Sequence, residues 1–290
     1  AQMMDLLREG GLGIDIPLLD ISAMHYDPKI IVELDEIARS RGWPPILFYI
    51  NDEIEYASRI AAARKVLEAI KKLSPDIKTT TALGPKGAAA LGHLYDVWIG
   101  CSTPEMIEKC LSMGQHPWTY SCRKVPDVSP AFERAFFGRF PWKIGLKGVS
   151  LWSYTENNTF YDRFGRQHDY KDFTFSPESK LNYGHVYYED DQIIPAVTWE
   201  AVREGIDDYR YMLTLEKTAM AALKSDNTHS TGQAALKLLD EIADRTPLLN
   251  DDVKYGRAWK QLGDMDAERD RVIKAILAIL KATKQQMPAA

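Results

Sequence analysis

Short apolar runs alternate with amphipathic helical patterns from Gly13 to Tyr154, and this alternation constrains the fold most. Each run is six to eight residues long, rich in β-branched or aromatic residues, and bounded by Gly, Pro or polar residues. Strands are expected over Gly13–Asp20, Pro45–Ile50, Ile77–Leu83, Tyr95–Gly100, His116–Cys122 and Gly148–Tyr154. Strands that alternate with helices predict a parallel sheet covered by helices.

The helical pattern is clearest over Ile54–Leu73, where apolar residues recur on one stripe. Another helix is expected after Cys101, with Thr103 as its N-cap and Pro104 in its first turn. From Pro195 onward the pattern is helical. The helices expected there cover Trp199–Leu223, Thr231–Arg245 and Asp252–Lys284.

Such a chain can form either an open doubly wound sheet or a barrel. No GxGxxG or GxxxxGK[ST] turn follows a strand, so the usual mark of a nucleotide-binding open sheet is missing. Polar and aromatic residues collect past the strand ends, as at the C-terminal mouth of a barrel. We therefore predict an α/β fold, a (β/α)8 TIM-type barrel over 1–195, with a C-terminal helical segment over 196–290 packing on it. Because only six strands are visible, the first two strands are expected to be missing from this chain.

The composition excludes several classes of protein. The 290 residues carry a net charge of −5, which gives no support to a nucleic-acid partner. No apolar run approaches the roughly 20 residues that span a bilayer, so we expect no membrane span. The three cysteines form no CxxC pair and the six histidines do not gather, so we expect neither a metal nor a cofactor. The cysteines are Cys101, Cys110 and Cys122.

The best candidates for catalysis are Asp52 and Glu53, which directly follow the strand Pro45–Ile50. Two carboxylates at the mouth of a barrel favour acid–base chemistry, because unlike surroundings can make one the acid and the other the base. A structural alternative is that Asp52 caps the following helix and Glu53 lies in its first turn, where acids are favoured. The spacing alone leaves both readings open.

The other strand ends suggest how such a pair would act. A retaining glycosidase usually has a second carboxyl about 5 Å from the first. The strand His116–Cys122 has no acid, and Glu156 is the only late candidate. The adjacent pair therefore fits substrate-assisted cleavage, in which the 2-acetamido oxygen of a sugar attacks its own anomeric carbon.

Aromatic residues near the strand ends favour a carbohydrate ligand, because sugars stack their apolar C–H faces on aromatic rings. The structural alternative is that each ring belongs to the barrel core. His25 also lies at a strand end and could neighbour the acids. The residues expected to bind substrate are Tyr120, Trp152, Trp98, Trp118, Tyr154 and His25.

Three stretches together resemble glycoside hydrolase family 123, a family of β-N-acetylgalactosaminidases whose C-terminal region many uncharacterised bacterial proteins share. They are the strand ending in Asp52-Glu53, WTYSC…FGRFPWKIGLKGVSLWSY, and IPAVTWEAVREGIDDYRYM. The resemblance covers most of Ile46–Met212. It implies a (β/α)8 barrel with the Asp-Glu pair at the end of its fourth strand. Ile54 stands where the family usually has Pro, and Thr198 where it often has Arg.

The resemblance implies a retaining hexosaminidase that removes terminal β-linked N-acetylhexosamine, with N-acetylgalactosamine as the expected main substrate. Asp52 would orient the 2-acetamido group, and Glu53 would be the general acid and then the general base. Tyr120 would donate a hydrogen bond to the acetamido oxygen, and Trp152 would form one wall of the sugar pocket. Arg203 and Asp207, four residues apart on a helix, are expected to form an ion pair.

Two other functions stay open. The chain could be a carbohydrate-binding protein that uses the same cleft without catalysis, or a glycosidase for a non-acetamido sugar with Glu156 as nucleophile. The resemblance is to bacterial proteins, but the first residues contain no signal peptide, so the compartment stays open. The oligomeric state is also left open.

Overall fold

The computed structural model describes residues 4, 6, 9, 18–122, 129–154, 159–161, 167–169, 184–189, 192–248 and 262–284. The chain divides into two compact units, 1–119 and 120–290. This boundary lies within the strand β5 (His116–Cys122), whereas the sequence analysis divided the chain at residue 195. The difference arises because α6 (Pro130–Phe137) and α7 (Arg139–Ile144) pack on the long helix α8 (Val197–Ala222).

Six parallel strands form one half-barrel sheet with the order β1-β2-β3-β4-β5-β6. Besides β5, they are β1 (Leu19–Ser22), β2 (Ile46–Ile54), β3 (Lys78–Leu83), β4 (Val97–Ile99) and β6 (Gly148–Trp152). The spatial order equals the sequence order, which repeated crossovers of one hand produce. The expected strand over Gly13–Asp20 begins in residues outside the described part, and β1 ends two residues later than expected.

The prediction of a (β/α)8 barrel is wrong, although the α/β class is confirmed. Among the described residues only six strands join the sheet, and β1 and β6 are its two edges. A barrel of this type closes with eight strands, each tilted and staggered against its neighbour. Alternating strand and helix patterns specify parallel pairing, but they do not specify how many strands the sheet contains or whether it closes.

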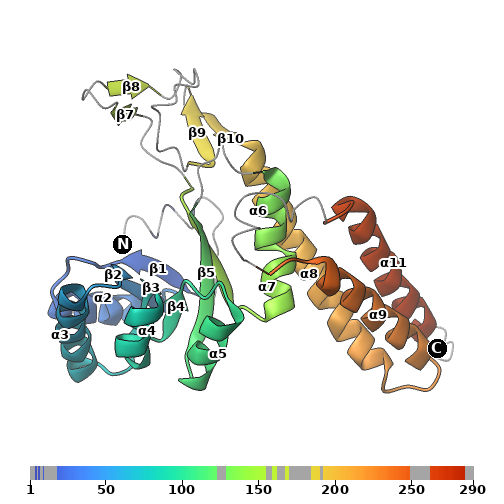
Figure 1. Ribbon diagram of the computed structural model, residues 1–290, viewed down its shortest axis with the longest axis horizontal. Helices are drawn as coiled ribbons and strands as arrows, with labels where there is room; N and C mark the ends of the chain where they lie inside the picture. Colours follow the sequence, from blue (N-terminus) through green and yellow to red (C-terminus); the bar gives the residue numbers. More distant parts are fainter. Residues whose placement is uncertain are drawn as a thin grey trace. The chain divides into compact units, whose positions relative to one another are not determined.

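The helices of the first unit are α2 (Pro28–Ser40), α3 (Ala57–Leu73), α4 (Pro85–Leu91), the short 3-10 helix η1 (Gly92–Leu94) and α5 (Pro104–Ser112). Figure 1 shows α2, α3 and α4 along one side of the strands β1 to β4. Fully buried side chains such as Phe48, Ile50, Leu67 and Ile70 fill this core. As predicted, Thr103 caps α5, and its hydroxyl oxygen accepts from the Met106 amide at 3.4 Å.

The second unit is mostly helical. In Figure 1, α8 runs beside α9 (His229–Arg245) and α11 (Met265–Lys284). Their shared core contains Met212, Leu215, Ala219, Leu239 and Ile242. Two short antiparallel pairs complete the described part: β7 (Thr159–Tyr161) with β8 (Gln167–Asp169), and β9 (Val186–Glu189) with β10 (Gln192–Pro195). No described helix is long and apolar enough to cross a membrane.

Candidate active site

Asp52 and Glu53 lie inside β2 and not after it, because this strand continues to Ile54. In the pairing with β3, Asn51 is opposite Thr81, but Ile54 is opposite Leu83. The two acids therefore face the single residue between Thr81 and Leu83, which is the definition of a β-bulge. A second register shift precedes them, between Tyr49 and Asn51. Bulges redirect side chains and are common beside active sites.

The backbone of Glu53 adds a second irregularity. Its φ is 44°, in the left-handed region that residues other than glycine rarely occupy. Such a conformation costs about 1 to 2 kcal/mol for an L-residue. Regular pairing on both sides of the bulge holds the residue there. Asp52 and Glu53 are both exposed, so this strained backbone presents two carboxylates to solvent.

The alternative reading of the pair as a helix start is wrong. The helix α3 begins at Ala57, and its N-cap residue, Tyr56, makes no side-chain capping bond. The carboxylate of Asp52 accepts a hydrogen bond from the Tyr49 hydroxyl at 2.5 Å instead. Asp52 is therefore tied to its own strand and does not cap the helix that follows.

The bulged strand explains how Tyr49 reaches Asp52. Residues three positions apart in a regular strand point to opposite faces of the sheet. The register shift between Tyr49 and Asn51 inserts one extra residue, which moves the alternation by one position and returns Asp52 to the face of Tyr49. Sequence reasoning missed Tyr49 for this reason, since a bulge leaves no mark in the hydrophobic pattern.

Buried hydroxyl groups hold the residue that precedes the pair. The Tyr95 hydroxyl donates to the side-chain oxygen of Asn51 at 3.0 Å, and the Thr81 hydroxyl donates to the Asn51 carbonyl at 2.5 Å. Tyr95 and Thr81 are both fully buried. Burial raises the pKa of Tyr95, which keeps the phenol protonated and able to donate. These two hydrogen bonds hold Asn51, the residue before the bulge, in place.

A third carboxyl lies on the neighbouring strand. Asp20 of β1 is in register with Leu47, two positions before the pairing of Ser22 with Tyr49, so the side chains of Asp20 and Tyr49 share one face of the sheet. The side chain of Asp20 is exposed, but desolvation by the atoms packed around it raises its pKa to about 6. A carboxyl that titrates near neutral pH on this face is a candidate member of the site. Sequence reasoning ended the first expected strand at Asp20 but did not consider it for the site, and the structure places it inside β1.

Among the predicted aromatic residues, Trp118 is at the level of the acid pair. It is in register with Ile99, and Ile99 with Ala82, the residue opposite the bulge. Three strand spacings, about 14 Å in a flat sheet, separate β2 from β5. Trp118 and Tyr120 are both partly exposed, and the residues that alternate with them on β5 are buried. Both rings therefore lie on the open face of this strand.

A further predicted residue, Trp98, does not join this group. Trp98 is fully buried, and its indole N–H donates to the carbonyl oxygen of Gly92 at 3.0 Å. It packs the sheet against η1, so the expectation that it faces a substrate is wrong, and the core alternative holds. His25 lies exposed in the turn after β1.

The remaining predicted residues belong to the second unit. Trp152 ends β6 and has 59% of its surface exposed. Tyr154 is 41% exposed, and its ring meets that of Trp199 edge-on at 4.9 Å. Glu156 lies outside the described residues. The second unit therefore offers two exposed aromatic rings close together in sequence, Trp152 and Tyr154.

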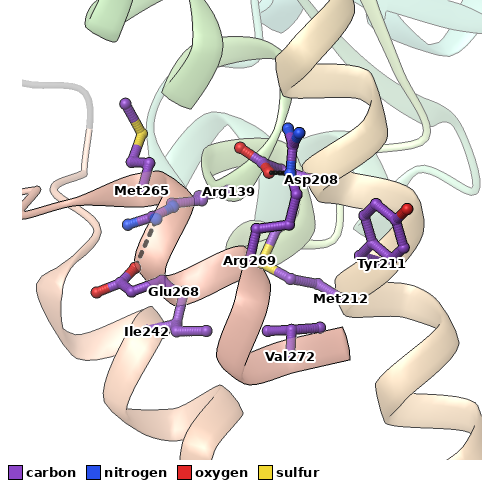
Figure 2. A pocket seen from close by; sticks show the side chains of 9 residues that line it. All are labelled: Arg139, Asp208, Tyr211, Met212, Ile242, Met265, Glu268, Arg269 and Val272. Atoms are coloured by element: carbon purple, nitrogen blue, oxygen red, sulfur yellow. Dashed lines mark hydrogen bonds and ion pairs between the residues drawn. The ribbon is translucent and has the colours of Figure 1, made fainter. Parts of the chain in front are cut away.

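The described part of the second unit also contains a cavity of about 10 Å³, shown in Figure 2. Arg139, Asp208, Glu268 and Arg269 line it, and Arg139 pairs with Glu268 at 2.5 Å. This volume has room for about one water molecule, so it cannot hold a sugar. The cavity belongs to the ion-pair network that joins α7, α8 and α11. The predicted pair of Arg203 and Asp207 is present at 3.7 Å.

Comparison with known families and curated proteins identified no match. No family model matches the chain, and no curated protein matches it either. Within the described ranges, no three His, Cys, Asp or Glu side chains gather in a way that could hold a metal ion. The assignment of function therefore rests on the residues around the bulge.

Proposed function

We propose that the chain is a retaining glycoside hydrolase that removes terminal β-linked N-acetylhexosamine, N-acetylgalactosamine foremost, with the 2-acetamido group of the substrate as nucleophile. The observation that carries this proposal is the bulge in β2, which holds two exposed adjacent carboxylates in a strained conformation. Strained residues of this kind cluster at active sites and ligand clamps. The resemblance to glycoside hydrolase family 123 supports the same reaction.

The roles of the two acids follow from the reaction. Asp52 accepts the acetamido N–H, which makes the carbonyl oxygen more nucleophilic towards the anomeric carbon. As the ring of the oxazolinium intermediate closes, Glu53 donates a proton to the departing glycosidic oxygen. Glu53 then takes a proton from water as that water opens the intermediate, and the anomeric configuration is retained.

The surroundings of the pair support substrate assistance over a protein nucleophile. In the described part of the chain, β3, β4 and β6 are followed by Gly84, Gly100 and Ser153, so none of these strands continues directly into an acid. Asp20 of β1 shares the face of Tyr49, and a protein nucleophile among the described strands would have to be this residue. The ring of Trp118, at the same level of the sheet, offers a surface on which a sugar can stack.

The test is hydrolysis of aryl β-glycosides that differ only at carbon 2. We expect the wild-type protein to hydrolyse the 2-acetamido sugars and not the 2-hydroxy sugars. Glu53→Gln should lower turnover about 10²- to 10⁴-fold for poor leaving groups and less for good ones, because an activated aryl group departs without a proton. Glu68→Gln, an exposed acid on α3, is the matched control and should be unchanged. Equal rates on 2-acetamido and 2-hydroxy sugars would contradict the proposal.

The exposed aromatic rings favour a second candidate, a carbohydrate-binding protein without catalysis. Trp152 and Tyr154 could bind an amino sugar even if the acids do nothing. Calorimetric binding of N-acetylhexosamine oligomers without product release, lost in Trp152→Ala and kept in Glu53→Gln, would establish this second function.

A further inference from the structure

Tyr49 is held rigidly at the base of the candidate site. It lies in the middle of β2, paired with Ser22 on one side and with Thr80 on the other. Its ring is partly buried, and its hydroxyl reaches Asp52 at 2.5 Å. A bond of this length between a hydroxyl and a carboxylate is at the short, strong end of the usual range. Tyr49 therefore transfers the rigidity of the sheet to an exposed side chain.

Asp52 needs such support. Its backbone lies in a bulge and its side chain is exposed, so nothing in the ladder of β2 and β3 fixes the direction of its carboxylate. A carboxylate has two oxygens and about four acceptor positions. When the Tyr49 hydroxyl occupies Oδ1, the plane of the group is restricted and Oδ2 stays available to a substrate.

We propose that Tyr49 is a positioning residue of the reaction, which holds Asp52 by Oδ1 so that Oδ2 receives the acetamido N–H of the sugar. This inference rests on the proposed function and adds to it a residue that touches Asp52 and not the reacting atoms. A misplacement of about 1 Å in such a group can cost roughly 10²-fold in rate. The loss of Tyr49 should therefore act on turnover and depend on Asp52.

A double-mutant cycle tests this dependence. Tyr49→Phe keeps the ring and removes only the donor, and we expect it to lower kcat for the 2-acetamido glycoside about 10- to 100-fold with a smaller change in KM. Asp52→Ala removes the acceptor. We expect Tyr49→Phe to cause no further loss in the Asp52→Ala background, because the two residues act as one unit. Tyr56→Phe, an exposed tyrosine at the start of α3, is the matched control.

A binding measurement keeps the test independent of turnover. A thiazoline derived from the same sugar is a stable analogue of the cyclic intermediate, and its ring nitrogen approaches Asp52 as the acetamido nitrogen does. By calorimetry, the thiazoline should bind about tenfold more weakly to Tyr49→Phe than to wild type. It should bind equally to the Asp52→Ala variant and to the double variant that also carries Tyr49→Phe. A second measurement compares wild type and Asp52→Ala, both labelled with ¹³C at tyrosine Cζ. One tyrosine resonance should shift between the two spectra, and this shift reports the bond between Tyr49 and Asp52 even if Tyr49→Phe fails to fold.

The outcomes separate this inference from the proposed function. If Tyr49→Phe lowered kcat equally in the wild-type and Asp52→Ala backgrounds, the inference would be overturned and the proposed hydrolase function would stand. An unchanged tyrosine spectrum in Asp52→Ala would overturn it as well. A wild-type protein that neither hydrolyses the glycosides nor binds the thiazoline would overturn the proposed function and this inference together.

Discussion

The α-carbon of Gly87 in α4 lies against the carbonyl oxygen of Ile54, so close that a Cβ at Gly87 would come to 2.2 Å from that oxygen. Ile54 is the residue after Glu53, where the bulge ends and regular pairing with β3 resumes. The helix and the strand can approach each other only because residue 87 has no side chain. This contact restrains the bulge at its C-terminal end, at Ile54, whereas the hydrogen bonds at Asn51 restrain its N-terminal end.

Gly87→Ala should disturb the candidate site without touching it. Because the added methyl group meets backbone, which cannot rotate away, either α4 or the end of β2 must move. We expect a loss of about 1 to 3 kcal/mol in the free energy of unfolding, measured with urea, and a fall in glycosidase activity. Lys86→Ala, an exposed change in the same helix, should leave both quantities unaltered.

Glu53→Gly should be more stable than Glu53→Ala. At a φ of 44°, glycine relieves the strain that alanine keeps, so we expect the two variants to differ by about 1 kcal/mol in favour of glycine. Both should lose the activity that depends on Glu53. Thermal unfolding monitored by circular dichroism measures the difference, and equal stabilities would show that the backbone relaxes in the alanine variant.

Tyr95→Phe should destabilise the first unit. The change leaves the side-chain oxygen of Asn51 without its 3.0 Å donor, which costs about 1 to 2 kcal/mol in the free energy of unfolding. Tyr56→Phe also removes a phenol hydroxyl, but from a side chain that is 69% exposed, and should cost almost nothing. A similar effect of the two changes in urea unfolding would argue against the role given to Tyr95.

Asp96 should make the fold sensitive to acid. Burial of the carboxyl acts to raise its pKa, but bonds from the Thr79 amide at 2.9 Å and Lys71 Nζ at 2.9 Å outweigh burial and lower it. A pKa depressed in the folded state stabilises the protein above the unfolded value of about 3.9, and this stability is lost as the pH falls through the folded value. Asp96→Asn should therefore be destabilised at pH 7.

The difference in unfolding free energy between wild type and Asp96→Asn should narrow as the pH falls below about 4, because the wild-type carboxyl then also becomes neutral. Urea titrations at pH 7, 5 and 3 measure it. The exposed acid Asp76 is the matched control, and Asp76→Asn should leave the free energy of unfolding at pH 7 almost unchanged. A constant difference across this pH range would contradict the assignment.

Asp207 and Asp208 are adjacent in sequence but should differ strongly in importance. Asp208 is 5% exposed and accepts bonds from Arg134 Nε at 2.7 Å and Arg269 Nε at 2.6 Å, so Asp208→Ala leaves two arginines without their shared partner. We expect a loss of about 3 to 5 kcal/mol in the free energy of unfolding. Asp207→Ala removes only exposed pairs and should cost less than about 1 kcal/mol. Chemical denaturation of the two variants gives a direct comparison.

Much of the fold could be predicted because it depends on local patterns. The alternation of apolar runs located five of the six strands, and β5 was predicted with the bounds that the structure has. The first expected strand overlaps β1 only at Leu19 and Asp20. The closed barrel was wrong because closure depends on the number of strands and their stagger, which no local pattern encodes. The division at residue 195 differed from the compact units because the packing of α6 on α8 is a contact between segments far apart in sequence.

The candidate site could be predicted only in part. Asp52 and Glu53 were proposed because two acids follow an apolar run, but the run does not reveal that the strand continues through them. Tyr49 and Tyr95 were missed because their roles depend on the bulge and on burial. Trp98 was misjudged because a tryptophan in a strand gives no indication of the face that it occupies, and here that face is covered by η1.

The bulge in β2 also bears on how a sheet of this kind can diversify. Tyr49 keeps its pairing with Thr80 before the irregular stretch, and Ile54 keeps its pairing with Leu83 after it. Asp52 and Glu53 lie between these two anchors and contribute little to the ladder. Mutations at either position can therefore replace one reactive group with another while the surrounding strands stay paired, so descendants of one ancestral sheet could acquire new chemistry by changing two codons.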